Sequence, residues 1–125
     1  LVDYLQKVKP DKRSEKRTYE VAEVSGALRS AAVASNVALI TLAQVNRESE
    51  QGKEPRMPRL CDLADSGQIE RDADTVALIH RDKNNNSEAK LFLAKQRDGE
   101  TGLIDLYFNG PLTRFEDHDN DNPSL

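Results

Sequence analysis

Two polar side chains each follow an apolar segment early in the chain, where they could act on a bound phosphate. Asp3 stands near the end of the apolar residues 1–5, and Gln44 follows the nearly continuous apolar run at 37–43. In an open α/β sheet, ligands bind beyond the carboxyl ends of the strands. A carboxylate there can hold the water shell of a magnesium ion, and an amide can contact a terminal phosphate. Judged by position alone, each side chain is better explained as an ordinary polar residue at the end of a strand, but two of them on neighbouring strand ends are more informative.

Two cations are spaced for a second contact with phosphate. Lys95 and Arg97 stand at alternate positions, and alternate side chains of a strand project from the same face. Adjacent cations repel one another unless an anion lies between them, so the pair suits a phosphate. A solvated strand face flanked by Asp98 and Glu100 is an equally good interpretation of the same residues.

Several other kinds of site are excluded. The acidic segment 61–74 holds five carboxylates, but their spacing does not follow an EF-hand calcium loop. One cysteine and two histidines cannot form the usual zinc site. The sequence contains no G-x-x-x-x-G-K-[ST] phosphate loop and no recognisable pairing of a serine with a histidine. These residues alone therefore cannot make a complete nucleotide hydrolase.

The charge and composition of the chain limit the kinds of partner that it can bind. The chain has 125 residues, enough for one domain, and a net charge of −4. Residues 1–60 contain 11 Lys and Arg against 8 Asp and Glu, whereas residues 61–125 contain 7 against 14, so any contact with a phosphate backbone must be local. The sequence has no apolar run long enough to span a membrane and no signal peptide, and the single Cys61 fits a reducing compartment. We expect a cytoplasmic protein with no membrane partner.

The elements that would position these residues follow from the hydrophobic pattern. Residues 1–5 resemble the end of a strand, and because natural domains seldom begin in their own core, we expect a fragment of a larger protein. A helical stripe predicts a helix from Thr18 to about Asn36, followed by a strand at 37–43 that is buried on both faces. The remaining predicted elements are a polar loop at 45–59, helical turns at 62–66 and 68–73, a buried strand at 75–79, and a hairpin with strands at 88–95 and 103–108. This order predicts an α/β fold with a mostly parallel sheet and helices, ending in an antiparallel hairpin.

Four stretches of the sequence, in order, resemble the C-terminal half of the DnaB-type replicative DNA helicases, which have the RecA-like ATPase (P-loop NTPase) fold. They are VDYLQ at 2–6, LITLAQVNRESE at 39–50, PRLCDLADSGQIERDADTVALIHR at 58–81 and AKQRDGETGLIDLYF at 94–108. The resemblance covers residues 1–115, which we expect to form the C-terminal portion of a helicase motor domain. Residues 116–125 are expected to be an acidic, disordered tail.

The resemblance implies roles for the residues singled out above. Asp3 corresponds to the Walker B aspartate, which acts on Mg²⁺ through water. Gln44 corresponds to the glutamine that couples the nucleotide site to the DNA-binding loops. Lys95 and Arg97 correspond to the pair that reaches the ATP of the neighbouring subunit in a homo-hexameric ring, with Arg97 as the arginine finger.

The resemblance also implies contacts with single-stranded DNA through a loop near the middle of the chain. The implied DNA-contact residues are Arg47, Asp65, Ser66 and Gly67. The family usually has arginine and then glutamate where this chain has Ala64 and Asp65, which removes a cation from the loop. The phosphate loop, the catalytic glutamate and the domain that binds primase lie upstream in the family, so primase and the helicase loader would bind through parts absent here.

The sequence therefore predicts part of a replicative helicase motor that couples ATP hydrolysis to translocation on single-stranded DNA and to duplex unwinding. The isolated chain is expected to be inactive because it lacks the phosphate loop. The alternative is a non-catalytic RecA-like remnant that serves as an interaction module.

Overall fold

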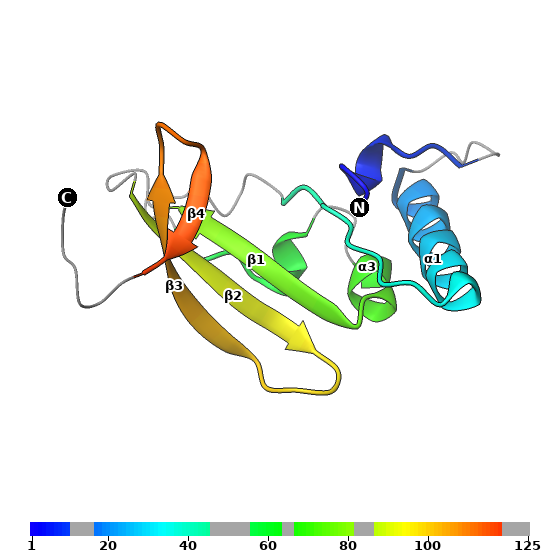
Figure 1. Cartoon of the computed structure of the whole chain (residues 1–125). Coiled ribbons are helices and arrows are strands. Elements are labelled where there is room, and N and C mark those ends of the chain that lie inside the picture. The colour runs from blue at the N-terminus through cyan, green and yellow to red at the C-terminus, as the bar shows by residue number, and fades with distance from the viewer. Residues whose placement is uncertain (11–16, 46–55, 64–66, 82–86, 119–125) are drawn as a thin grey trace. The chain divides into compact units, whose positions relative to one another are not determined.

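The computed structural model describes residues 1–10, 17–45, 56–63, 67–81 and 87–118 of the chain (Figure 1). The chain divides into two compact units, Leu1–Asp74 and Thr75–Leu125.

The first unit contains two α-helices and two short 3₁₀ helices among the described residues. The elements are η1 (Leu5–Lys7), α1 (Arg17–Ser35), η2 (Leu60–Asp62) and α3 (Gly67–Asp72). Helix α1 confirms the predicted helix, and it buries Val21 and Val24 from the predicted stripe. It ends where Asn36 adopts a left-handed φ of 51°, a conformation that asparagine tolerates and that terminates many helices.

The second unit contains a four-stranded antiparallel sheet in the order β1-β2-β3-β4. Its strands are β1 (Thr75–Arg81), β2 (Glu88–Gln96), β3 (Gly102–Asn109) and β4 (Arg114–Asp117). The predicted hairpin is confirmed as β2 and β3, which pair from Glu88↔Tyr107 to Leu93↔Gly102. Strand β4 was not predicted, because its sequence Arg-Phe-Glu-Asp has only one apolar residue.

Each unit has its own small core. Leu5, Val21, Val24, Leu63 and Ile69 are buried in the first unit. The second unit buries Val76, Leu78, Ala89 and Phe108. The rings of Phe108 and Phe115 lie 4.9 Å apart, and the Arg81 guanidinium lies 3.8 Å from the Phe108 ring centroid, so aromatic and cation–π contacts tie β1, β3 and β4 together.

The prediction of a mostly parallel sheet is wrong for the described residues. Residues 37–43 form no named strand, and Val37, Ile40 and Leu42 are exposed. In the described part of the chain, parallel pairing is limited to one isolated bridge, between Val2 and Thr41. A parallel strand is stable when neighbours cover it on both sides. Besides each other, the described chain gives these segments one isolated antiparallel bridge, between Val45 and Leu63.

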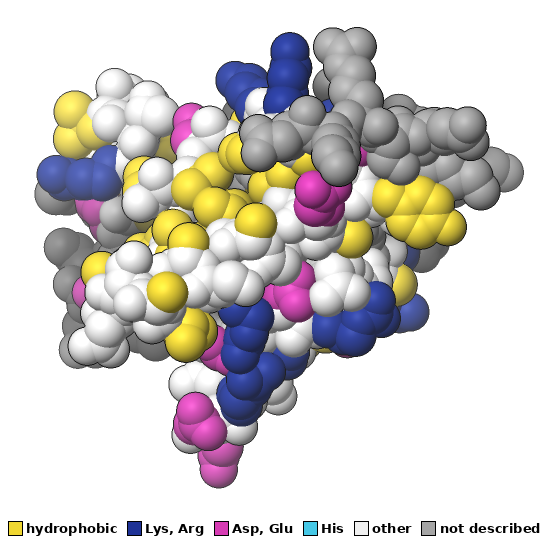
Figure 2. Space-filling model, turned by 90° about the vertical axis from the view of Figure 1, so that its right-hand side faces the viewer, with side chains coloured by type: hydrophobic (Ala, Val, Ile, Leu, Met, Phe, Trp, Pro, Cys, Tyr) yellow, Lys and Arg dark blue, Asp and Glu magenta, His cyan; other side chains and the backbone are white. Residues whose placement is uncertain are grey.

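The predicted strand at 75–79 is confirmed as β1, but it is not buried on both faces. Val76 and Leu78 are buried, whereas Ala77 and Ile79, which alternate with them, are exposed, which is the alternation of an antiparallel sheet with one covered face. Exposed hydrophobic side chains also lie on the face of the molecule shown in Figure 2, among lysine, arginine and acidic side chains. No helix among the described residues is long and apolar enough to cross a membrane.

Candidate functional site

The segments that carry Asp3 and Gln44 lie side by side and run in the same direction. The Val2 N–H donates to the Ile40 carbonyl, and the Leu42 N–H donates to the Val2 carbonyl, each at 2.9 Å. The side chains of Asp3 and Gln44 are exposed beside this pairing. The first two residues predicted to act on phosphate are thus held on adjacent segments, although neither segment is a regular strand.

The side chain of Gln6 bonds to the backbone of Gln44 in both directions. Its Oε1 accepts the Gln44 N–H at 3.2 Å, and its Nε2 donates to the Gln44 carbonyl at 3.4 Å. The sequence patterns assigned Gln6 no role, although it belongs to the VDYLQ stretch. A glutamine three residues after a strand-end aspartate carries no local signal, because its partner is 38 residues away.

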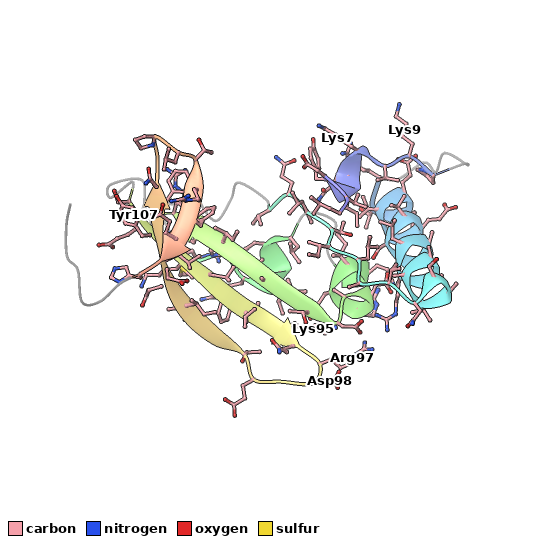
Figure 3. All side chains as sticks on the ribbon, in the orientation of Figure 1. Lys7, Lys9, Lys95, Arg97, Asp98 and Tyr107 are labelled. Atoms are coloured by element: carbon pink, nitrogen blue, oxygen red, sulfur yellow. The ribbon has the colours of Figure 1, made fainter. Side chains whose placement is uncertain are left out.

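Lys95 and Arg97 lie at one end of the β2–β3 hairpin (Figure 3). Lys95 pairs with Val76 of β1 and is half-buried, while Arg97 follows the end of β2 in a bend and is exposed. The register of β1 and β2 shifts between Val76 and Ala77, so the pairing is irregular next to Lys95. The alternate spacing therefore brings two cations to one hairpin end, with Arg97 beyond the strand itself.

Most of the predicted DNA-contact residues lie outside the described residues. This applies to Arg47, Asp65 and Ser66. Gly67 is exposed and is the first residue of α3. Two carboxylates, Asp62 and Asp72, lie before and after this part of the sequence, and each accepts several hydrogen bonds.

Asp62 is buried and is held by two hydrogen-bonded partners. Its carboxylate accepts hydrogen bonds from both terminal nitrogens of Arg56, each at 2.7 Å, and from the backbone N–H of Arg59 at 2.7 Å. The hydrogen bonds from Arg56 and then from Arg59 lower the pKa of Asp62 from its ordinary 3.8 to about 2. The same ion pair raises the pKa of Arg56. Asp62 therefore stays ionised and fixes the segment that ends at the buried Leu63.

Asp72 joins α3 to α1. Its two carboxylate oxygens accept hydrogen bonds from the Ser25 hydroxyl at 2.7 Å and the Gln68 amide at 2.8 Å. Arg29 of α1 donates to the backbone carbonyl of Asp72 and pairs with Asp74 at 3.1 Å. The aspartates of the segment IERDAD are thus contacts between helices rather than ligands for a metal.

The sequence patterns do not predict these carboxylate contacts; for the acidic residues of 61–74 they gave only a rejected calcium site and, by resemblance, a DNA contact for Asp65. Among the described residues, no group of three or more His, Cys, Asp or Glu side chains could hold a metal ion. A usable signal was the position of Asp62 three residues after Arg59, the spacing at which a carboxylate caps the start of a helical turn.

The chain matches the family model of the DnaB-like helicase C-terminal domain over residues 1–117. It is 41% identical over 124 residues to the replicative DNA helicase DnaB of Buchnera aphidicola subsp. Acyrthosiphon pisum, covering 94% of this chain and 27% of that protein. It is 42% identical over 122 residues to the DnaB of Haemophilus influenzae, covering 93% of this chain and 26% of that protein. The chain thus spans about a quarter of the length of these relatives.

Solved structures agree with this match. A DnaB-like replicative helicase, described together with its interactions with primase, superposes with a TM-score of 0.85 at 33% identity, covering 94% of this chain and 30% of that one. A second solved structure, an ATPase domain, superposes with a TM-score of 0.83 at 35% identity, covering 94% of this chain and 43% of that one. The match over nearly the whole chain, in sequence and in structure, means that the chain belongs to the DnaB-like helicase C-terminal domain family.

Proposed function

We propose that this chain is part of an ATP-dependent replicative helicase motor that translocates on single-stranded DNA and unwinds duplex DNA. The observation that carries the proposal is the parallel pairing of Val2 with Thr41, which sets the segments of Asp3 and Gln44 side by side. A carboxylate and an amide on adjacent segments are the groups needed to act on a nucleotide and to respond to its terminal phosphate. Family membership supports the same assignment.

The residues present fit Mg²⁺ held mainly by a nucleotide. Asp3 is exposed, and a single carboxylate suits an ion that keeps several waters and takes its other ligands from phosphates. Bound with ATP, the ion would neutralise the charge that develops on the transferred phosphate. Asp3 would orient a water of its shell, and Gln44 would contact the terminal phosphate or the attacking water.

Lys95 and Arg97 would act on ATP held by a neighbouring subunit of a homo-hexamer. Arg97 is exposed in the bend after β2, where it is accessible to a second chain. The planar fork of arginine can bind two phosphate oxygens, while lysine acts as a point charge. Arg97 would therefore stabilise the transition state, and Lys95 would add affinity for the nucleotide.

Single-stranded DNA would be contacted through Arg47 and the residues Asp65, Ser66 and Gly67. The net charge of −4 and the presence of Ala64 in this loop predict weak binding by one chain that is largely lost at physiological salt. In a hexameric ring, several weak contacts would add through multivalency. Primase and a helicase loader would be partners through segments outside these 125 residues, and the proposed location is the cytoplasm.

The test uses a chimeric helicase in which residues 1–117 replace the matching segment of the Haemophilus influenzae DnaB. Arg97→Ala should reduce ATP turnover by about a thousandfold or more, while nucleotide binding and hexamer formation persist. Lys95→Ala should also weaken nucleotide binding. Lys90→Ala is the matched control, because Lys90 is a cation of the same strand that pairs with Asp105 at 2.9 Å, and it should leave turnover unchanged.

A mixing experiment tests action between subunits. Arg97→Ala subunits are mixed with subunits disabled in the phosphate loop of the Haemophilus influenzae segment, and mixed rings should recover part of the activity. Normal turnover of Arg97→Ala alone, or no recovery despite proven co-assembly, would contradict the assignment. The isolated 125-residue chain should not hydrolyse ATP. If the chain binds a partner subunit but Arg97→Ala has no effect in the chimera, the chain is an interaction module instead.

A further inference from the structure

Gln6 extends the pairing between two segments at the point where their backbones separate. The last backbone hydrogen bond between them joins the Leu5 N–H to the Leu42 carbonyl at 2.8 Å. Beyond it the first segment turns into η1, where the Lys7 N–H bonds back to the Tyr4 carbonyl at 2.9 Å. The backbone of Gln6 is thus directed into η1 and makes no further bond of the parallel kind in the described chain.

The side-chain amide of Gln6 continues the pairing in place of a backbone peptide group. A primary amide offers one carbonyl acceptor and an N–H donor, which is the same pair of groups that a peptide unit offers. Gln6 uses both on one residue, since it accepts the Gln44 N–H at 3.2 Å and donates to the Gln44 carbonyl at 3.4 Å. The neighbouring Leu5 is buried in the core, with 4% of its surface exposed, and this packing fixes the position of the Gln6 backbone.

We propose that Gln6 is a positioning residue that sets the orientation of Gln44 and links it to the segment of Asp3. Both peptide groups of Gln44 that Gln6 contacts flank the Gln44 Cα, so their restraint limits the directions in which the Gln44 side chain can project. Asp3 lies three residues before Gln6 on the same segment. A short stretch of backbone therefore connects Gln6 to the aspartate that we propose acts on magnesium. The inference rests on the proposed function of Asp3 and Gln44 in ATP hydrolysis.

Two substitutions separate the two hydrogen bonds. Gln6→Ala removes both of them. Gln6→Glu keeps an oxygen that accepts the Gln44 N–H but replaces the donor with a second oxygen, which faces the Gln44 carbonyl and repels it. In the chimeric helicase, each variant should lower the ratio of DNA-stimulated to unstimulated ATP hydrolysis by roughly twofold to tenfold, the range expected for one or two exposed hydrogen bonds. Lys7→Ala, on the next residue of η1, should leave this ratio unchanged.

A double-mutant cycle distinguishes positioning from general support of the fold. Gln6 acts on the backbone of Gln44, so its bonds survive in Gln44→Ala, but there is no longer a functional side chain to orient. Gln6→Ala should therefore lower the stimulation ratio in the unchanged chimera and have no further effect in the Gln44→Ala background. An equal reduction in both backgrounds would mean that Gln6 only stabilises the segment, and the inference would be wrong.

The same cycle distinguishes a failure of the inference about Gln6 from a failure of the proposed function of Gln44. If Gln44→Ala leaves DNA stimulation unchanged, Gln44 does not couple the two sites and the proposed function of this residue fails. If Gln44→Ala abolishes stimulation while Gln6→Ala and Gln6→Glu both keep it at the unchanged level, the proposed function stands and the positioning role of Gln6 is overturned.

Discussion

The two units of the chain are stabilised in different ways. In the second unit, ladders of backbone hydrogen bonds join four strands, with one register shift between β1 and β2, so that many residues contribute to the stability of the sheet. In the described part of the first unit, regular pairing between segments is limited to isolated bridges, and polar side chains make long-range contacts. Asp72 accepts a hydrogen bond from Ser25 across 47 residues, and Gln6 bonds to Gln44 across 38 residues. Asp62 makes a local contact with Arg56, six residues away. A structure that depends on few side chains should be far more sensitive to single substitutions.

The difference extends to the candidate functional residues. Lys95 lies in β2 and pairs with Val76 of β1, and Arg97 follows in the bend after β2. Asp3 and Gln44 lie on irregular segments that a few backbone hydrogen bonds and the Gln6 side chain hold together. Substitution of residues that touch no ligand should therefore impair function in the first unit. These residues make the supporting contacts that fix the geometry of the ligand-binding side chains.

The largest effect on stability is expected for Asp62→Ala. The substitution removes three hydrogen bonds to a buried carboxylate and leaves Arg56 without its bidentate partner. We expect the free energy of unfolding of the first unit to fall by about 2–3 kcal/mol, as for other hydrogen bonds to charged groups. Denaturant unfolding of the chain, followed by the circular dichroism of the helices, measures this loss. Asp105→Ala on β3 is the matched control, and an equal loss there would remove the distinction between the units.

Acid should destabilise the first unit through the same residue. The pKa of Asp62 is lower in the folded chain than its ordinary value, so its contribution is present above pH 4 and is lost as the pH falls from about 4 to about 2. The contribution is about 2 kcal/mol, from the conversion of pKa shift to free energy. Asp62→Asn should flatten the stability curve over this pH range. Unfolding curves with the same acid dependence in both proteins would show that other carboxylates are responsible.

A smaller loss is expected where α3 joins α1. Asp72→Asn exchanges one acceptor oxygen for a donor, so it cannot accept from both Ser25 and Gln68, and we expect a loss of about 1–2 kcal/mol. Ser25→Ala should cost about 1 kcal/mol. The double variant should lose less than the sum of the two, because both substitutions break the same contact. Additive losses in thermal or denaturant unfolding would mean that the two residues act independently.

The smallest effect is expected for Asp105→Asn in the second unit. The carboxylate pairs with Lys90 at 2.9 Å, but both side chains are largely solvated, at 59% and 43% exposure. Exposed ion pairs of this kind contribute about 0.5 kcal/mol or less. The midpoint temperature of thermal unfolding should therefore change little, and high salt should remove the remaining difference. A loss as large as that of Asp62→Asn would show that the sheet also depends on single side chains.

Local patterns in the sequence predicted the elements that are stabilised by near neighbours. The apolar spacing of Val21 and Val24 predicted α1, and the alternation at 88–95 and 103–108 predicted β2 and β3. The prediction of a buried strand at 37–43 was wrong, because hydrophobicity indicates a preference for burial but does not supply the neighbours that would provide it. The short β4 was missed, since its pairing with β3 rests on backbone bonds, one aromatic contact and one hydrogen bond from Asn109 to Glu116.

The sequence by itself determined the chemistry that the 125 residues can offer: an aspartate and a glutamine that each follow apolar residues, two cations at alternate positions, and no phosphate-loop motif. It also determined the family, because four stretches occur in the expected order. Only the tertiary structure decided how Asp3 and Gln44 are held, with Gln6 pairing to Gln44 across 38 residues, and that Asp72 joins α3 to α1 through Ser25. The physical reason is that a hydrogen bond depends on a distance of about 3 Å, and the fold sets that distance for residues far apart in sequence.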